Sequence, residues 1–147
     1  MEQPQNPYAT PATNAHNPAT DPPYEAPTLV QLLFSFDGRI SRSPYWMGLL
    51  LLMGTVFVPL LFLSFLGAAS EGAAGLVLAL VGILMLLVTY CSWAVSAKRW
   101  HDRGKSGWWT LIQLIPFGSI WMLIECGFLP GEPGANQYGS DPKGPRA

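Results

Sequence analysis

The sequence predicts an all-α membrane protein with three transmembrane helices, a short interfacial helix before them and a disordered N-terminal arm. The chain of 147 residues is half hydrophobic, and its 8 Lys and Arg plus 9 Asp and Glu make only 17 charged residues. A globular domain of this length would carry roughly a quarter charged residues. The hydrophobic residues concentrate between residues 29 and 129, while both ends are rich in proline. Apolar stretches of that length suit a bilayer better than a water-soluble core.

The first 36 residues divide into an arm and a short apolar segment. Residues 1–28 contain seven prolines and many Asn, Ala and Thr residues. Such a composition buries too little apolar surface to offset the entropy of ordering, so we expect a disordered arm. Residues 29–36 (LVQLLFSF) are apolar but too short to cross a bilayer, which predicts an interfacial half-helix. The predicted domains are therefore the arm, a membrane domain over residues 29–142 and a tail end over residues 143–147.

Three apolar stretches are the predicted spans, at residues 45–66, 73–97 and 108–129. The first has 22 residues and no charge. At 1.5 Å per residue it reaches about 33 Å, which exceeds a hydrocarbon core of about 30 Å. The second is also uncharged, whereas the third is interrupted at residues 116–118 (PFG) and carries Glu125.

Small residues recur at spacings of three and four in and before the second span. They are Ala68, Gly72, Gly75, Ala79 and Gly82. Small side chains on one helical stripe allow another membrane helix to approach closely. We therefore expect close packing there, and a possible homo-oligomer through Gly75, Ala79 and Gly82.

The basic residues predict the orientation. Arg39 and Arg42 precede the first span, and four more basic residues lie in the loop at residues 98–107, whereas residues 67–72 between the first two spans contain none. The positive-inside rule then places the N-terminus and the 98–107 loop in the cytoplasm.

The side of the C-terminal tail depends on the third span. Three full spans put the tail on the outer side, and this is the topology we favour from the sequence. If residues 116–118 instead form the tip of a re-entrant hairpin, the tail returns to the cytoplasm. Each arm of that hairpin would have only about ten residues, or about 15 Å of helix, and non-helical backbone at depth would need protein cover.

Two polar segments face each other across the predicted cytoplasmic surface, at residues 37–42 and 98–109, and residues 136–142 are a possible third. The basic residues in them could attract anionic headgroups by about 1 kcal/mol each, or could merely fix the topology. The candidate polar or headgroup site comprises Arg39, Arg42, Lys98, Arg99, His101, Asp102, Arg103, Lys105 and Ser106.

Catalytic, metal and nucleic-acid functions have little support. His101 beside Asp102 could be a general base with an orienting carboxylate, with Ser106 nearby, but such a pair in a juxtamembrane turn is more often structural. The Gly-Lys-Ser triplet at residues 104–106 lacks the first glycine and the preceding strand of a phosphate-binding loop. Two lone cysteines make no zinc site, and a net charge of −1 offers nothing to nucleic acid. We predict no enzyme activity, no cofactor and no metal.

Glu125 is the single acid inside a predicted span. Intramembrane acids are costly and can mark proton or ion paths. Glu125 lies only four residues from Leu129, however, which is about 6 Å of helix, so it can also reach the interface.

Three segments of the chain resemble a known family. They are FDGRISRSPYW, KRWHDRGKSGWW and PGEPGANQYGSDP, in this order around the spans. This pattern is similar to the YhaH-like inner-membrane family known as domain of unknown function 805, over about residues 30–142. The resemblance implies a small multi-pass inner-membrane protein and brings no established activity with it. The arm lies outside the match.

Three functions remain in view from the sequence. The first is a membrane-embedded structural or interaction protein whose cytoplasmic segments contact lipid headgroups or another protein. The alternative is a subunit of a small oligomeric transporter or channel in which Glu125 lines the path. The third is a membrane enzyme that uses His101 and Asp102. We favour the first because the other two require groups that this sequence does not supply.

Overall fold

The computed structural model of the protein describes residues 23–67 and 74–144. Over these residues the chain is helical, and its sole β-type pairing is an isolated bridge between Asn136 and Gly139. The all-α membrane class is confirmed. The elements in chain order are α1 (Leu29–Phe34), α2 (Arg42–Gly67), α3 (Ala74–His101), the 3-10 helix η2 (Gly107–Leu114), α4 (Gly118–Met122) and the π-helical turn η3 (Leu123–Phe128).

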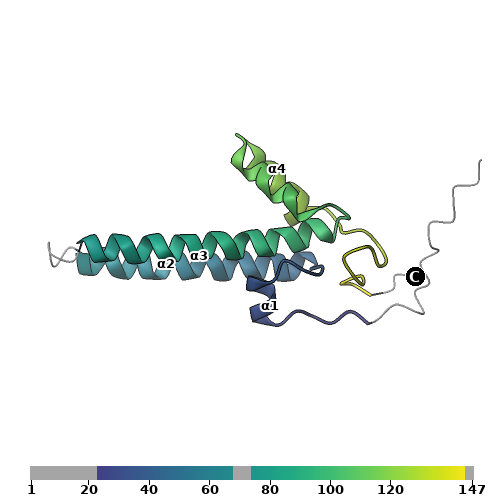
Figure 1. Ribbon diagram of the computed structural model, residues 1–147, viewed down its shortest axis with the longest axis horizontal. Coiled ribbons are helices and arrows are strands. Elements are labelled where there is room, and N and C mark those ends of the chain that lie inside the picture. Colours follow the sequence, from purple (N-terminus) through teal and green to yellow (C-terminus); the bar gives the residue numbers. More distant parts are fainter. Residues whose placement is uncertain (1–22, 68–73, 145–147) are drawn as a thin grey trace, which may run out of the picture.

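Helices α2 and α3 form a long antiparallel pair (Figure 1). Among the described residues, these are the two helices that are long and apolar enough to cross a membrane, over Arg42–Phe65 and Gly75–His101. Their large side chains point mostly outward, including Phe57, Leu61, Leu78 and Leu86. In water such a surface would be unstable, so the lipid tails of a bilayer must cover it.

The third apolar segment differs in form from the continuous span predicted over residues 108–129. It is a hairpin of η2 followed by α4 and η3, and we call Gly107–Phe128 the apolar hairpin. The chain reverses at Ile115–Gly118, where Phe117 adopts a left-handed φ of 66°. Pro116 has no N–H to continue a helix. Gly118 is required because a Cβ there would lie 1.7 Å from the Ile112 carbonyl oxygen.

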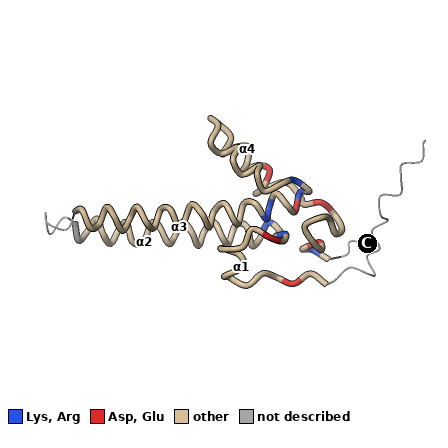
Figure 2. Tube along the Cα trace, viewed as in Figure 1, with Lys and Arg blue, Asp and Glu red and all other residues tan. Residues whose placement is uncertain are grey.

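The buried core lies at one end of the helix pair. Leu32 of α1, Ile40, Tyr45 of α2, Val95 and Trp100 of α3 and Cys126 of η3 form one cluster. The charged residues gather at this same end (Figure 2). Here α2 and α3 come close, since a Cβ on Gly48 would meet Val95 at 3.3 Å. The protein is therefore an apolar rod with one structured polar end.

Two further sequence predictions, the disordered arm and the small-residue stripe, fall only partly within the described residues. Residues 1–22 of the predicted arm lie outside the described residues, and residues 23–28 are extended but not free. Thr28 and Gln31 form a capping box that starts α1, and the Tyr24 hydroxyl donates to the Arg39 carbonyl at 3.5 Å. In the small-residue stripe, Ala68 and Gly72 also lie outside the described residues. Gly75 and Gly82 have nothing of their own chain within 4 Å of an added Cβ.

Candidate functional site

The centre of the polar end is a cluster of Arg39, Arg99 and Asp102, which we call the buried triad. Asp102 Oδ1 accepts hydrogen bonds from Arg39 Nε at 3.3 Å and Nη2 at 3.0 Å, and Oδ2 accepts from Arg99 Nη1. The three side chains are only 1 %, 0 % and 6 % exposed for Arg39, Arg99 and Asp102. Burial raises the pKa of Asp102, and the two guanidiniums act in the opposite direction. Buried charges are tolerated only when paired in this way.

Arg39 also holds the C-terminal tail, residues 130–144. Its Nη1 donates to the carbonyls of Gly134 at 2.7 Å and Gly139 at 3.1 Å, and its Nη2 to that of Glu132 at 2.7 Å. The Glu132 N–H in turn donates to the Asp102 carbonyl at 2.7 Å. The tail therefore packs on the end of α3 that carries the 98–107 loop. This is the arrangement expected of a hairpin third segment, and not of the full span that we favoured from the sequence.

The tail itself is a set of hydrogen-bonded turns that present one aromatic ring to α3. Asn136 and Gly139 exchange backbone hydrogen bonds of 3.0 Å. The Tyr138 ring stacks on His101 with centroids 3.9 Å apart and planes at 4°. The Asn136 side chain donates to the His101 carbonyl at 2.9 Å. His101 Nδ1 lies 3.2 Å from the Gly38 carbonyl oxygen. His101 and Asp102 thus have separate partners and do not form a base–carboxylate pair.

Two arginines and a tryptophan cap the end of the apolar hairpin. Arg99 Nε donates to the Cys126 carbonyl at 2.7 Å, and its Nη2 donates to that of Leu129. Arg42 donates to the Phe128 carbonyl at 3.0 Å, and the Trp46 indole to that of Gly127 at 3.2 Å. The last carbonyls of a helix lack partners within it and carry partial negative charge. The guanidiniums of Arg42 in α2 and Arg99 in α3 donate hydrogen bonds to these carbonyls and offset their partial negative charge.

Lys98 does the same for α1. Its Nζ donates to the carbonyls of Leu32 at 2.7 Å, Gln31 and Ser35, and the residue is only 1 % exposed. A six-residue helix is too short to be stable alone. The ammonium therefore fixes α1 to the end of α3.

Replacing Lys98 with Met should release α1. The substitution keeps most of the side-chain volume and removes three hydrogen bonds to a charged donor, each worth about 1.5–3 kcal/mol but not additive. We expect faster hydrogen exchange at the Leu32 and Ser35 amides, which bond within this turn. The exposed Lys143→Met is the matched control. Unchanged exchange in Lys98→Met would show that apolar contacts alone hold α1.

Glu125 is paired with the loop. Its Oε1 accepts from Lys105 Nζ at 2.8 Å, and its Oε2 lies 2.6 Å from Arg103 Nη2. Lys105 Nζ also lies over the rings of Trp100 and Trp109, at 5.3 and 5.5 Å from their centroids. The carboxylate is thus paired with two cations at the base of the hairpin. Such pairing is what a structural carboxylate requires.

Most of the predicted site is brought together, but its donors point inward. Arg39, Lys98 and Arg99 are buried and bonded to their own chain, Arg42, Arg103 and Lys105 also bond within it, and the Ser106 hydroxyl caps η2. The basic residues donate hydrogen bonds to carbonyls at helix ends and in the tail, and so hold these segments together. The sequence analysis missed their acceptors, because every residue has a carbonyl and a backbone oxygen leaves no signal in the sequence.

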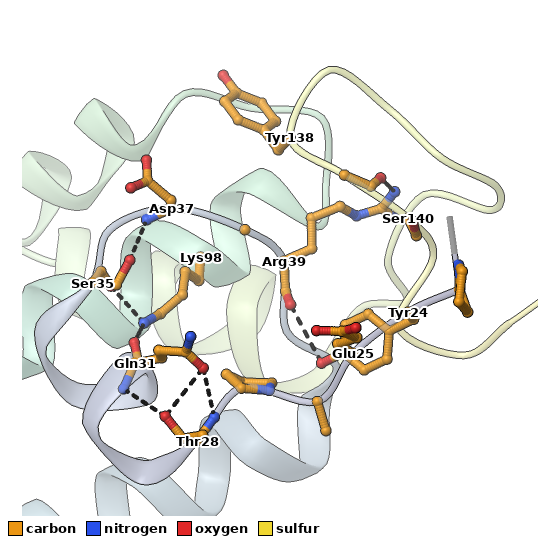
Figure 3. Close-up of a pocket in the computed structure, with 15 residues that line it drawn as sticks. Tyr24, Glu25, Thr28, Gln31, Ser35, Asp37, Arg39, Lys98, Tyr138 and Ser140 are labelled. Atoms are coloured by element: carbon orange, nitrogen blue, oxygen red, sulfur yellow. Dashed lines mark hydrogen bonds between the residues drawn. The ribbon is translucent and has the colours of Figure 1, made fainter. Parts of the chain in front are cut away.

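One open groove of about 490 Å³ lies beside the triad (Figure 3). Its walls come from the extended segment with Tyr24 and Glu25, from α1, and from the tail with Tyr138. The backbone of Asp37 closes a turn onto the Ser35 hydroxyl at 3.1 Å. The carboxylates of Glu25 and Asp37 are exposed and have no hydrogen-bond or ion-pair partner within the described chain.

These features define a small helical membrane protein whose polar segments close on one another at one end of a two-helix pair. The chain belongs to the family described as Protein of unknown function (DUF805), whose sequence profile matches residues 33–140. That range contains the buried triad, the capped hairpin and most of the tail, so the resemblance drawn from the sequence is confirmed.

Three Escherichia coli (strain K12) proteins are similar to the chain. Inner membrane protein YhaH is 39 % identical over 108 residues, which cover 74 % of this chain and 87 % of that protein. Inner membrane protein YhaI is 32 % identical over 111 residues, covering 74 % and 86 %. Uncharacterized protein YiiR is 29 % identical over 140 residues, covering 78 % and 90 %. No solved structure matches the chain.

Proposed function

We propose that the protein is a membrane-anchored interaction protein of the inner membrane, with the polar end in the cytoplasm, and that it carries out no reaction of its own. The observation that supports this most is that the charged side chains of the polar end are engaged within the chain. The buried carboxylates of Asp102 and Glu125 pair with arginines and with Lys105, and the six clustered cations bond to these carboxylates or to backbone carbonyls. General acid–base catalysis needs a group that is free to give or take a proton, whereas a rigid platform does not.

The groove is the surface on which we propose that a partner binds. It is open, and it joins an extended segment, a helix and a tail loop that the triad holds in place. Among the described residues, the charged groups of the groove without a hydrogen-bond or ion-pair partner are the carboxylates of Glu25 and Asp37, with the rings of Tyr24 and Tyr138 nearby. Carboxylates and tyrosine rings both attract cations. The fitting partner is a protein segment with exposed basic side chains.

A photo-crosslinking amino acid at Ala26 tests this in living cells. Ala26 lines the groove, is exposed and has no polar role. We expect one discrete protein adduct, lost when Glu25 and Asp37 are both changed to Lys because the partner's basic groups are then repelled. Lys143→Glu changes the charge of this end outside the groove and should leave the adduct intact.

The same probe at Leu86 of α3, which is 74 % exposed on the lipid-facing surface, should give no such adduct. An Ala26 adduct of twice the chain's mass would mean that a second copy occupies the groove. If the adduct persists when Glu25 and Asp37 are both changed to Lys, a partner that binds through basic side chains is excluded. Adducts to lipid alone would favour the headgroup-contacting role over a protein partner.

A homo-oligomer through Gly75, Ala79 and Gly82 remains a separate proposal. These residues are exposed in the single chain. Their openness agrees with a helix contact from outside the chain.

A further inference from the structure

We infer that the apolar hairpin inserts into a single leaflet of the bilayer and returns, so that its tip contacts acyl chains. The hairpin starts at the polar end, and its helix α4 diverges from the α2–α3 pair at an angle (Figure 1). Residues 106–124 contain no charged side chain. Most of its exposed side chains are large and apolar, among them Trp108, Leu114, Phe117 and Trp121. Two of its polar side-chain atoms, Thr110 Oγ1 and Gln113 Nε2, are buried within the chain and have no hydrogen-bond partner among the described residues.

The lengths of the two limbs match one leaflet. The first limb is η2, whose 8 residues at about 2.0 Å each give about 16 Å. The second joins the 5 residues of α4 to the 6 of η3, which at 1.5 Å each is at most about 16 Å. A hydrocarbon core is about 30 Å thick, so one leaflet contributes about 15 Å. Neither limb can cross, and both can reach toward the bilayer centre.

The turn at the tip suits an apolar environment. In lipid every backbone N–H needs a partner within the protein. The Ile115 N–H donates to the Ile112 carbonyl at 3.1 Å, and the Gly118 N–H to that of Ile115 at 2.9 Å. Pro116 has no N–H to satisfy. The Trp121 N–H already donates to the Phe117 carbonyl at 3.2 Å. Within the tip, the N–H groups of Ile115, Gly118 and Trp121 are therefore satisfied by carbonyls of the hairpin itself.

The base of the hairpin is polar and clamped. Glu125 binds Lys105 and Arg103, and Arg99 and Arg42 cap the carbonyls that end η3. These groups lie on the same end as the tail and the N-terminal segment. Lipid around the tip and charge around the base is the distribution of a one-leaflet insertion, and this arrangement leaves the tail and the 98–107 loop on the same side of the membrane.

Two measurements on the full chain in phosphatidylcholine vesicles test the inference. The first places a fluorophore on Phe117→Cys at the tip, with Ser119→Cys as a second tip site where the first does not fold. We expect the strongest quenching by lipids brominated within the acyl chains. Phe57→Cys in α2 is the reference for a site at the depth of the acyl chains. A fluorophore on Asp37→Cys at the polar end should instead be quenched by a water-soluble quencher.

The second measurement replaces Cys91 and Cys126 with Ala and labels single introduced cysteines with a membrane-impermeant maleimide in sealed vesicles of one orientation. Lys143→Cys in the tail should react from the same side as Asp37→Cys. Glu71→Cys, which lies between α2 and α3 in the sequence, should react from the opposite side. Tail labelling from the Glu71 side would mean a full third crossing. If the fluorophore at the tip is quenched by a water-soluble quencher or by a quencher at headgroup depth, the hairpin lies flat on the membrane surface. Either result overturns the inference, and neither depends on a partner for the groove.

Discussion

Replacing Asp102 with Ala should cost about 3–5 kcal/mol of unfolding free energy, because it leaves two buried guanidiniums without a counter-charge. The carboxylate accepts three hydrogen bonds from Arg39 and Arg99 and is almost fully buried. The buried thiols of Cys91 and Cys126 give the readout. In detergent, a thiol-reactive dye should label them at a clearly lower temperature in the variant than in the native protein.

Asp37→Ala is the matched control for that experiment. Asp37 is an exposed carboxylate close to the triad in space and has no ion-pair partner within the described chain, so the change should be within about 0.5 kcal/mol. Equal melting of Asp102→Ala and Asp37→Ala would show that the triad does not stabilise the fold.

Gly131→Ala should detach the tail at a cost of about 1–3 kcal/mol. A Cβ at this position would lie 1.9 Å from Asp102 Oδ2 and 2.5 Å from its Cγ. The carboxylate cannot move aside because Arg39 and Arg99 hold both of its oxygens. We expect the Glu132 amide, which donates to the Asp102 carbonyl, to lose its protection from hydrogen exchange.

Gly54→Ala serves as the comparison for this effect. Gly54 lies inside α2, and an added Cβ meets nothing within 4 Å, so the Glu132 amide should stay protected. If Gly131→Ala leaves that protection unchanged, the tail does not depend on close contact with Asp102. In that case the hydrogen bonds from Arg39 to the tail carbonyls would be enough to hold it.

The membrane class, the two long spans and the family could all be predicted from the sequence. Uncharged runs such as 45–66 and 73–97 have one energetically acceptable environment, and α2 and α3 contain them almost whole. The motif segments sit in a fixed order along the chain, so their resemblance needs no knowledge of distances. The short helix over residues 29–36 was also predictable, because an apolar segment that ends at Asp37-Gly38 is too short to span.

For the third apolar segment the sequence allowed two conformations, a full span and a re-entrant hairpin. Residues 108–129 have the length and hydrophobicity of a span, and hydropathy alone favours a continuous crossing. The local signal against it, Pro116 followed by Phe117 and Gly118, is also compatible with a kinked span. What decides between them is the set of long-range bonds from Arg99 and Arg42 that draw residues 126–129 back to the polar end.

The sequence by itself determined that this chain lives in a membrane and that its charges gather at the ends of apolar segments. Tertiary structure alone decided what those charges do. Arg39, Lys98 and Arg99 look like topology or headgroup residues in one dimension, yet each donates to backbone carbonyls from 27 to 100 positions away in the chain. The physical reason is that a carbonyl acceptor has no residue type. Its place is fixed only when helices end beside one another, and a sequence pattern cannot report where that happens.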